Sequence, residues 1–240
     1  MTLTIALDTA TDLATIGVGD ADGLIAEVTL GRQRHAAATV PAVLQVLDLA
    51  GATFRDVSRI VLADGPGSFT GLRIGVATVQ GLLRERDGIA VFTAPSLLAA
   101  AWGGSQLADG PVAALYDALR GDVYGAVYAF EDGVRVLLPP TLAPVAELAD
   151  RVPHVSLAVG DGAARYAAAV QRWTGRRPVG PPMGSPRAGA LLALAARPGA
   201  VVPVPDIMTF EPTYGRPAEA QARWERQHGR PLPDSPGRPL

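Results

Sequence analysis

The sequence contains no cysteine, lysine or asparagine, so all 21 residues counted as lysine plus arginine are arginine. The absence of cysteine excludes disulfides, thiolate zinc sites, iron–sulfur clusters and a cysteine nucleophile. Without lysine the chain forms no Schiff base and lacks the phosphate-binding lysine of a Walker motif, and without asparagine it has no N-glycosylation acceptor. No apolar run approaches the ~18 residues of a membrane span, and the N-terminus lacks the basic segment that opens a signal peptide. We therefore expect a cytoplasmic protein with no membrane contact.

The residues that are present suffice for a folded protein. The chain has 240 residues, of which 48% are hydrophobic and 18% charged. A folded monomer of this size hides roughly 70% of the surface that its unfolded chain exposes, so the composition excludes a natively unfolded protein. The formal net charge is −2. The overall field therefore does not attract nucleic acid or an anionic membrane, and any such partner must be held in another way.

The first half of the chain alternates short apolar runs with longer helical patterns. Apolar runs bounded by turn residues predict strands, and apolar positions at helical spacing predict helices. Gly51 ends the first helix, and Pro41 within it either sets the first helical position or kinks the helix. The predicted order is strands 3–7, 14–18 and 24–30, helix 36–50, strand 60–63, helix 70–86, strand 89–92 and helix 95–102.

The second half repeats this plan. Its predicted order is strands 112–115, 123–130 and 134–138, helix 144–150, strand 155–159 and helix 163–173. We interpret the chain as two copies of one βββαβα unit with mixed sheets, an α/β fold, although any α/β protein shows some loose self-similarity. The predicted domains are an N-terminal lobe over 1–105, a C-terminal lobe over 106–215 and a flexible Arg/Pro-rich tail over 216–240.

A glycine-rich segment between a predicted strand and a predicted helix is the most distinctive part of the sequence. At such a junction, unpaired backbone N–H groups and the positive helix end can receive an anion. The glycines do not match the spacing of a Walker loop or of a dinucleotide-binding loop. Alternatively, Gly65 and Gly67 form a tight turn, while Gly71 and Gly75 give the helix a flat face on which another element packs. We favour the packing role.

Few other side chains point to catalysis. Asp8 and Asp117 end predicted strands, where they could hold a metal-bound water for phosphoryl transfer or simply hydrogen-bond their own turns. The sequence leaves both roles open. The only histidines, His35, His154 and His228, do not have the spacing of a helical metal site. No serine lies in a GxSxG motif, which excludes an esterase-type nucleophile elbow.

Six short segments carry a resemblance because of the order in which they occur. They are Ile5-Ala-Leu-Asp-Thr9, Arg34-His35 followed by Pro41, Gly65-Pro-Gly-Ser-Phe-Thr-Gly-Leu-Arg-Ile-Gly75, Asp117-Ala-Leu-Arg-Gly-Asp-Val-Tyr124, Gly160-Asp-Gly162 and Pro212-Thr-Tyr-Gly-Arg216. As an ordered set they resemble the TsaB family, also called YeaZ. The resemblance implies two actin-like, ribonuclease-H-like lobes of the ASKHA class. It also implies a bacterial accessory protein for making threonylcarbamoyladenosine in tRNA.

The resemblance carries expectations about partners. In that system a paralogue, TsaD, transfers the threonylcarbamoyl group and has two metal-binding histidines four residues apart. In this sequence Ser96 and Ala100 stand at the similar positions, and neither replaces an imidazole at a transition metal. The resemblance therefore implies a non-catalytic subunit that binds and activates TsaD. It implies no metal or cofactor on this chain alone, ATP use by the complex, TsaE and a TsaC-type protein as pathway partners, and indirect contact with tRNA.

Two sets of candidate site residues follow. The family pairs through a helix bundle, so the predicted partner-binding residues are His35, Val40, Val43, Leu44, Leu47, Gly71, Arg73 and Gly75. The predicted nucleotide or anion site consists of Asp8, Gly65, Gly67, Ser68, Asp117, Gly160 and Gly162. A homodimer and a heterodimer both remain open. The alternative functions are an ATP-dependent phosphotransferase of the actin-like kinase class and, more distantly, a metallopeptidase-like protein.

Overall fold

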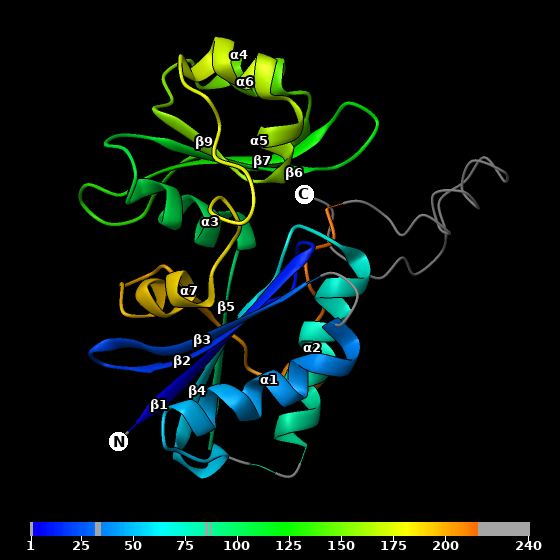
Figure 1. The fold of residues 1–240 in the computed structure, drawn as a ribbon, viewed down its shortest axis with the longest axis vertical. Helices are drawn as coiled ribbons and strands as arrows, with labels where there is room; N and C mark the ends of the chain where they lie inside the picture. The colour runs from blue at the N-terminus through cyan, green and yellow to red at the C-terminus, as the bar shows by residue number, and fades with distance from the viewer. Residues whose placement is uncertain (1, 32–34, 85, 87, 216–240) are drawn as a thin grey trace, which may run out of the picture.

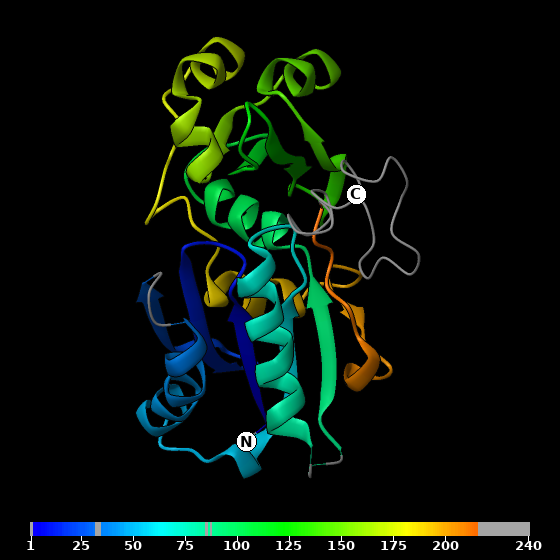
Figure 2. The same ribbon diagram turned by 90° about the vertical axis from the view of Figure 1, so that its right-hand side faces the viewer.

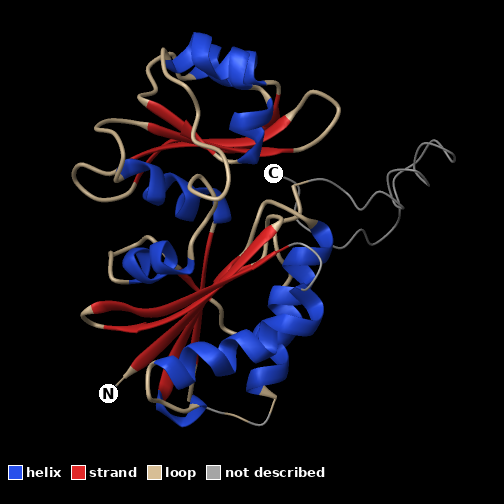
Figure 3. Cartoon of the chain, viewed as in Figure 1, coloured by secondary structure: helices blue, strands red, loops and turns tan. Residues whose placement is uncertain are grey.

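The computed structural model describes residues 2–31, 35–84, 86 and 88–215. The predicted tail, 216–240, lies outside the described residues. Figure 1 shows two lobes stacked along the long axis of the molecule, each built on one β-sheet, and Figure 3 shows helices on both faces of each sheet. The two-lobed α/β prediction is confirmed.

The N-terminal lobe is built on a six-stranded mixed sheet. Its strands, in the order β10-β5-β4-β1-β2-β3 across the sheet, are β10 (Val202–Pro203), β5 (Ala90–Ala94), β4 (Val57–Ala63), β1 (Leu3–Asp8), β2 (Leu13–Asp20) and β3 (Gly23–Gly31). One face is covered by α1 (His35–Leu49) and α2 (Phe69–Leu83), and the other by α7 (Ala188–Ala195). Alternate residues of a strand point to opposite faces. Ile5 and Leu7 therefore join the core beneath α1 and α2, whereas Ala6 joins the core beneath α7.

The C-terminal lobe is built on a four-stranded mixed sheet. Its strands, in the order β8-β7-β6-β9, are β8 (Arg135–Ala143), β7 (Val123–Ala129), β6 (Val112–Asp117) and β9 (Leu157–Val159). Helix α3 packs on the face that looks toward the N-terminal lobe, and three helices cover the outer face. The helices are α3 (Ser96–Ser105), α4 (Val145–Arg151), α5 (Asp161–Arg165) and α6 (Ala167–Thr174).

The duplication is visible in the strand pairing. Strand β1 pairs antiparallel with β2 and parallel with β4, and strand β6 pairs antiparallel with β7 and parallel with β9. The order β3-β2-β1-β4 in the first sheet thus corresponds to the order β8-β7-β6-β9 in the second. The structure confirms two copies of the βββαβα unit, to which the first sheet adds β5 and β10.

The predicted division of the chain at residue 105 differs from the structure. Helix α3, placed by the prediction in the N-terminal lobe, packs on the sheet of the C-terminal lobe. After residue 186 the chain returns to the N-terminal lobe, where α7 covers β1, β2 and β3 and β10 pairs with β5. Helix α7 was not predicted from the sequence because it is buried on most sides and lacks a polar face whose period could be recognised.

Two predicted helices also differ in detail. The predicted helix 163–173 is two helices, because Tyr166 between them leaves the helical conformation at φ −103° and ψ 34°. No glycine or proline marks this break in the sequence. Pro41 lies inside α1, so it does not set the first helical position.

Helices α3 and α7 form the layer between the two sheets (Figure 2). Alanine supplies 12 of the 24 buried residues of this core, compared with 2 of 18 in the core beneath α1 and α2. Small side chains let the layers approach closely, so the lobes are joined by packing as well as by the connecting chain.

Candidate functional site

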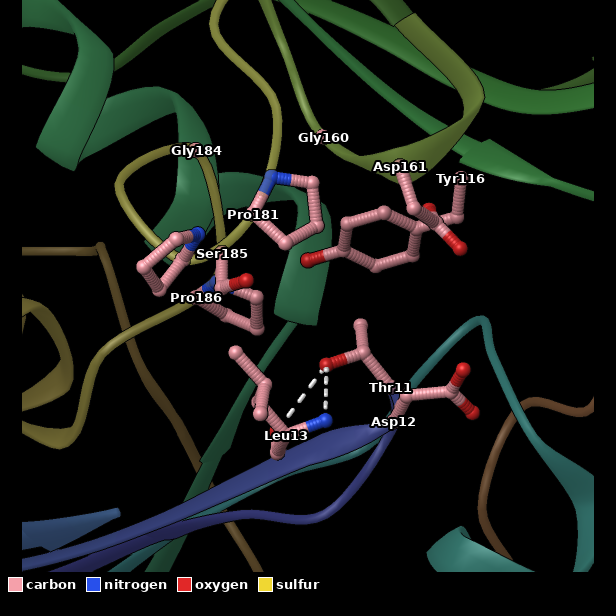
Figure 4. A pocket seen from close by; sticks show the side chains of 11 residues that line it. Thr11, Asp12, Leu13, Tyr116, Gly160, Asp161, Pro181, Gly184, Ser185 and Pro186 are labelled. Atoms are coloured by element: carbon pink, nitrogen blue, oxygen red, sulfur yellow. Dashed lines mark hydrogen bonds between the residues drawn. The ribbon is translucent and has the colours of Figure 1, made fainter. Parts of the chain in front are cut away.

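A cavity of about 360 Å³ lies between the two lobes. Figure 4 shows that its walls come from the β1–β2 turn, the end of β6, the turn after β9 and the proline-rich segment that precedes α7. The lining residues are Thr11, Asp12, Leu13, Tyr116, Gly160, Asp161, Pro181, Pro182, Gly184, Ser185 and Pro186. The cleft thus brings together elements of both repeats, as expected for an actin-like fold.

The charge of this cleft is unfavourable for a polyphosphate. Within the described part of the chain its charged lining residues are Asp12 and Asp161, and none of the eleven is basic. Burial raises the pKa of Asp161, while the backbone N–H groups of Asp117 and Gly162 donate hydrogen bonds to its carboxylate. Among these described lining residues, a bound phosphate group would meet like charge and no basic side chain.

Asp8 does not open into the cleft. It is fully buried at the end of β1, where Ser96 Oγ donates a hydrogen bond to it at 2.6 Å and the N–H of Ala10 donates another at 2.9 Å. Ser96 Oγ lies 3.0 Å from the hydroxyl of Tyr116, which donates to the carbonyl oxygen of Ser96 at 2.8 Å. Burial raises the pKa of Asp8 to about 6. The carboxyl group therefore belongs to an internal network that joins β1, α3 and β6.

The glycines of the predicted anion site lie in two separate turns and pack against backbone. A Cβ at Gly67 would collide with the carbonyl oxygen of Ala10, and one at Gly160 with that of Leu115. A Cβ at Gly65 would meet the carbonyl oxygen of Thr213, and one at Gly162 would meet the backbone of β6. These glycines serve close packing.

The start of α2 is already occupied by the chain itself. Ser68 Oγ accepts a hydrogen bond from the N–H of Gly71 at 3.2 Å, which caps the helix. The N–H of Ser68 donates to the carbonyl oxygen of Ala10 at 2.7 Å. Two of the groups that an anion would use at this helix end therefore have protein partners.

Asp117, the counterpart of Asp8 in the second repeat, is engaged on the surface of its lobe. Its carboxylate forms an ion pair with Arg165 at 3.1 Å and accepts hydrogen bonds from the Tyr166 hydroxyl and the Leu119 N–H. Leu119 and Arg120 have φ of 62° and 57°, which is uncommon for residues other than glycine. No sequence pattern used above predicts this left-handed turn.

The predicted partner-binding stripe of α1 has two sides. Val40 is 43% exposed and Leu44 is 58% exposed, whereas Val43 and Leu47 are buried in the core of the chain. The prediction that Val43 and Leu47 face a partner is wrong, because these two residues pack on the sheet. The exposed pair, four residues apart, is out of phase with the buried stripe. Sequence analysis missed Leu49, which is 63% exposed near the end of the same helix.

The glycines of α2 also face inward. A Cβ at Gly71 would collide with the carbonyl oxygen of Thr9, and one at Gly75 would meet the Thr9 side chain at 2.6 Å. The favoured packing role is therefore confirmed, but the element that packs there is the β1–β2 turn of the same chain. The prediction that a partner helix packs directly on these glycines is wrong, because Thr9 already covers them.

Arg73 and His35 complete the predicted set. Arg73 is exposed on α2, and its guanidinium lies 5.2 Å from the centre of the Phe69 ring. Phe69 in turn packs on Tyr214, with ring centres 4.4 Å apart. His35 is the first residue of α1, and its side chain lies outside the described residues. The outer surface of α1 and α2 thus combines apolar side chains with an arginine that lies over an aromatic ring.

Metal-binding groups are not gathered in the described residues. Among these residues, no three histidine, cysteine, aspartate or glutamate side chains lie together as a metal site. Ser96 and Ala100, which stand where the resemblance places paired histidines, are both buried. None of the described helices is long and apolar enough to span a bilayer.

The duplicated unit, the two mixed sheets and the cleft between them define a two-lobed protein of the actin-like ASKHA class. A family model described as TsaD, tRNA N6-adenosine threonylcarbamoyltransferase, matches residues 23–170. The Bacillus subtilis protein TsaB, a tRNA threonylcarbamoyladenosine biosynthesis protein, is 30% identical over 227 residues, 92% of this chain and 96% of the relative. Escherichia coli TsaB is 32% identical over 126 residues, 52% of this chain and 54% of the relative.

A solved structure gives the same result. YeaZ from Pseudomonas aeruginosa superposes with a TM-score of 0.73 at 27% identity, covering 89% of this chain and all of that one. The chain belongs to the TsaB/YeaZ family.

Proposed function

We propose that the protein is a non-catalytic accessory subunit in the formation of N6-threonylcarbamoyladenosine in tRNA, and that it binds and activates the catalytic paralogue TsaD. The observation that carries the proposal is the outer face of α1 and α2. There Val40, Leu44 and Leu49 are exposed on a helix whose other side is fixed in the core. TsaE and a TsaC-type protein act in the same pathway, and the complex rather than this chain uses ATP.

The composition of this face is typical of an interface. Burial of an aliphatic side chain such as Leu44 is worth about 1.5–3 kcal/mol, and arginine and aromatic residues are enriched where binding energy concentrates. Arg73 over Phe69 supplies such a pair at the start of α2. Because both helices are anchored on the sheet, the face is presented without prior ordering of the chain.

The surroundings of the acidic residues support a role without catalysis. Asp8 is bound by Ser96 and Ala10, and Asp117 by Arg165. The alternative functions, a phosphotransferase and a metallopeptidase-like protein, require a grip on phosphate or a set of metal ligands. The described residues that line the cleft include no basic side chain to hold phosphate. The described residues also contain no group of three side chains that could hold a metal ion.

The test replaces one exposed residue at the proposed interface. Leu44→Arg should weaken binding of the TsaD from the same cell by roughly 10-fold or more, because a charge is placed in an apolar contact. Val136 is a matched control, since it is 53% exposed on β8 of the other lobe. Val136→Arg should leave the dissociation constant unchanged, and both variants should keep the melting temperature of the parent protein.

Two results would contradict the proposal. If Leu44→Arg binds TsaD as tightly as the parent protein does, the outer face of α1 and α2 is not the binding surface. Substantial ATP turnover by the isolated chain, lost in Asp8→Ala, would support the phosphotransferase of the actin-like kinase class instead.

A further inference from the structure

Positive charge is concentrated in one part of the chain. Residues 162–205 contain six arginines and no aspartate or glutamate, although the whole protein has a formal net charge of −2. The six are Arg165, Arg172, Arg176, Arg177, Arg187 and Arg197. All 23 acidic residues therefore lie outside this segment.

Three of these arginines have partners within the protein. Arg165 forms the ion pair with Asp117, Arg187 forms one with Glu27, and Arg197 stacks on Trp102 at 4.2 Å from the ring centre. The other three, Arg172, Arg176 and Arg177, have exposed side chains and make no ion pair with any residue that the structure describes.

A fourth arginine is brought beside them by the packing of α4 on α6. The indole N–H of Trp173 donates a hydrogen bond to the carbonyl oxygen of Val152 at 2.8 Å, which ties the end of α6 to the end of α4. The exposed Arg151 is the last residue of α4. Figure 1 shows α4 and α6 on the outer side of the C-terminal lobe, and the ends of both helices carry an exposed arginine.

A structural role explains only part of this cluster. A cation near a helix C-terminus is worth about 0.3–1 kcal/mol through the helix dipole, and Arg151 and Arg172 occupy such positions. Arg176 and Arg177 come after Gly175, where the helix ends in a left-handed residue at φ 70°. Their charges lie beyond the last turn of α6, so stabilisation of the helix end does not account for them.

We propose that this basic end, formed by Arg151, Arg172, Arg176 and Arg177, binds the phosphate backbone of RNA. A nucleic acid presents phosphates at regular spacing, and the guanidinium group binds them with paired hydrogen bonds. An anionic membrane fits less well, because the neighbouring aromatic, Trp173, is half-buried and its N–H is already used. The inference rests on the proposed function, in which tRNA is the substrate of the complex, and it adds a direct contact between tRNA and this chain.

The position of the basic end is compatible with partner binding. Both views place α4 and α6 at the opposite end of the molecule from α1 (Figures 1 and 2). A protein bound to the outer face of α1 and α2 would leave the arginines open. The two contacts are therefore separable by mutation.

The experiment measures binding of the full chain to unmodified tRNA by fluorescence anisotropy between 50 and 200 mM salt. The double variant Arg176→Ala/Arg177→Ala should lose roughly 10-fold or more in affinity at the lowest salt. The slope of log K against log salt should decrease by about 1.4 to 1.8, since each phosphate contact contributes about 0.7–0.9. The control, Arg55→Ala/Arg135→Ala, removes two exposed arginines elsewhere and should bind as the parent does.

Three results would overturn the inference. They are an equal loss of affinity in both double variants, an unchanged salt slope in the Arg176/Arg177 variant, and preferential binding to vesicles containing phosphatidylserine over tRNA. Association with TsaD is measured in parallel and should be the same for all variants. Failure of the parent chain to bind TsaD would contradict the proposed function, whereas tRNA binding that does not depend on Arg176 and Arg177 would contradict this inference.

Discussion

The two copies of the βββαβα unit each end their first strand with an aspartate, yet the two aspartates have different surroundings. Asp8 is fully buried, takes its hydrogen bonds from Ser96 and the chain backbone, and has a pKa of about 6. Asp117 remains partly exposed and forms an ion pair with Arg165. The same position in a repeated plan therefore does not carry the same chemistry, because the elements packed around it differ.

The cause of the difference lies in the last helix of each unit. In the first copy the glycines of α2 let the β1–β2 turn lie directly on the helix, which removes Asp8 from solvent. In the second copy the corresponding helix is broken at Tyr166, whose hydroxyl reaches Asp117. Glycines pack closely on the end of the first strand or the turn after it in both copies, but the first aspartate is fully buried whereas the second is held by polar side chains.

The largest expected effect is the loss of stability when the close packing of α2 on the β1–β2 turn is disrupted. Gly75→Leu should destabilise the protein by about 3 kcal/mol or more, because the new side chain would displace Thr9 and crowd Leu62 in a closely packed region. Gly81 is a matched control in the same helix, since a Cβ there meets nothing within 4 Å. Gly81→Leu should be neutral or slightly stabilising because leucine favours the helix. Urea unfolding of both variants tests this, and equal stability of the two would contradict the assignment of Gly75 to the core.

A smaller effect is expected from the buried carboxyl group. The pKa of Asp8 is raised from 3.8 to about 6, so the native state binds a proton more tightly than the unfolded chain does. The free energy of unfolding should therefore fall as pH rises from about 4 through 6 and then level off. The contribution is at most about 3 kcal/mol, at 1.36 kcal/mol for each pKa unit.

Asp64, at the start of the glycine-rich turn, adds a change of the same sign, because burial also raises its pKa to about 6. Asp8→Asn removes one of the two contributions. The variant should lose less stability between pH 5 and pH 7.5 than the parent, as measured by urea unfolding at each pH. If the free energy of unfolding changes equally with pH in the parent and the variant, Asp8 titrates normally and is not shielded from solvent.

The smallest effect is expected in the second copy. Arg165 is 58% exposed in its side chain, and exposed ion pairs contribute about 0–1 kcal/mol. Asp117→Asn keeps an oxygen that can accept the hydrogen bond from the Leu119 N–H, so its loss of stability should be below about 1 kcal/mol. A double-mutant cycle with Arg165→Ala measures the pair directly. A coupling energy well above 1 kcal/mol would mean that the ion pair of Asp117 and Arg165 is shielded from solvent, as Asp8 is.

Much of the fold could be predicted because it depends on local pattern. The short apolar runs of β2 and β3 between turn residues, the helical spacing of α1 and the glycine that ends it are properties of neighbouring residues, and they identified the repeated unit. The family motifs are likewise strings of adjacent residues. The candidate site was less predictable, since the periodicity that placed Val43 and Leu44 on one helix does not say which of them faces the sheet.

The sequence was enough to establish the order of strands and helices in both repeats, apart from the break at Tyr166, as well as the absence of cysteine and lysine chemistry and the family. Long-range packing was needed to show that α7 returns to the N-terminal lobe, that the glycines of α2 receive the chain's own turn, and that Asp8 is fully buried while Asp117 is partly exposed. Secondary structure follows from interactions a few residues apart, whereas burial and pKa depend on elements that are distant along the chain. Ser96, which holds Asp8 from 88 residues away, is the clearest case.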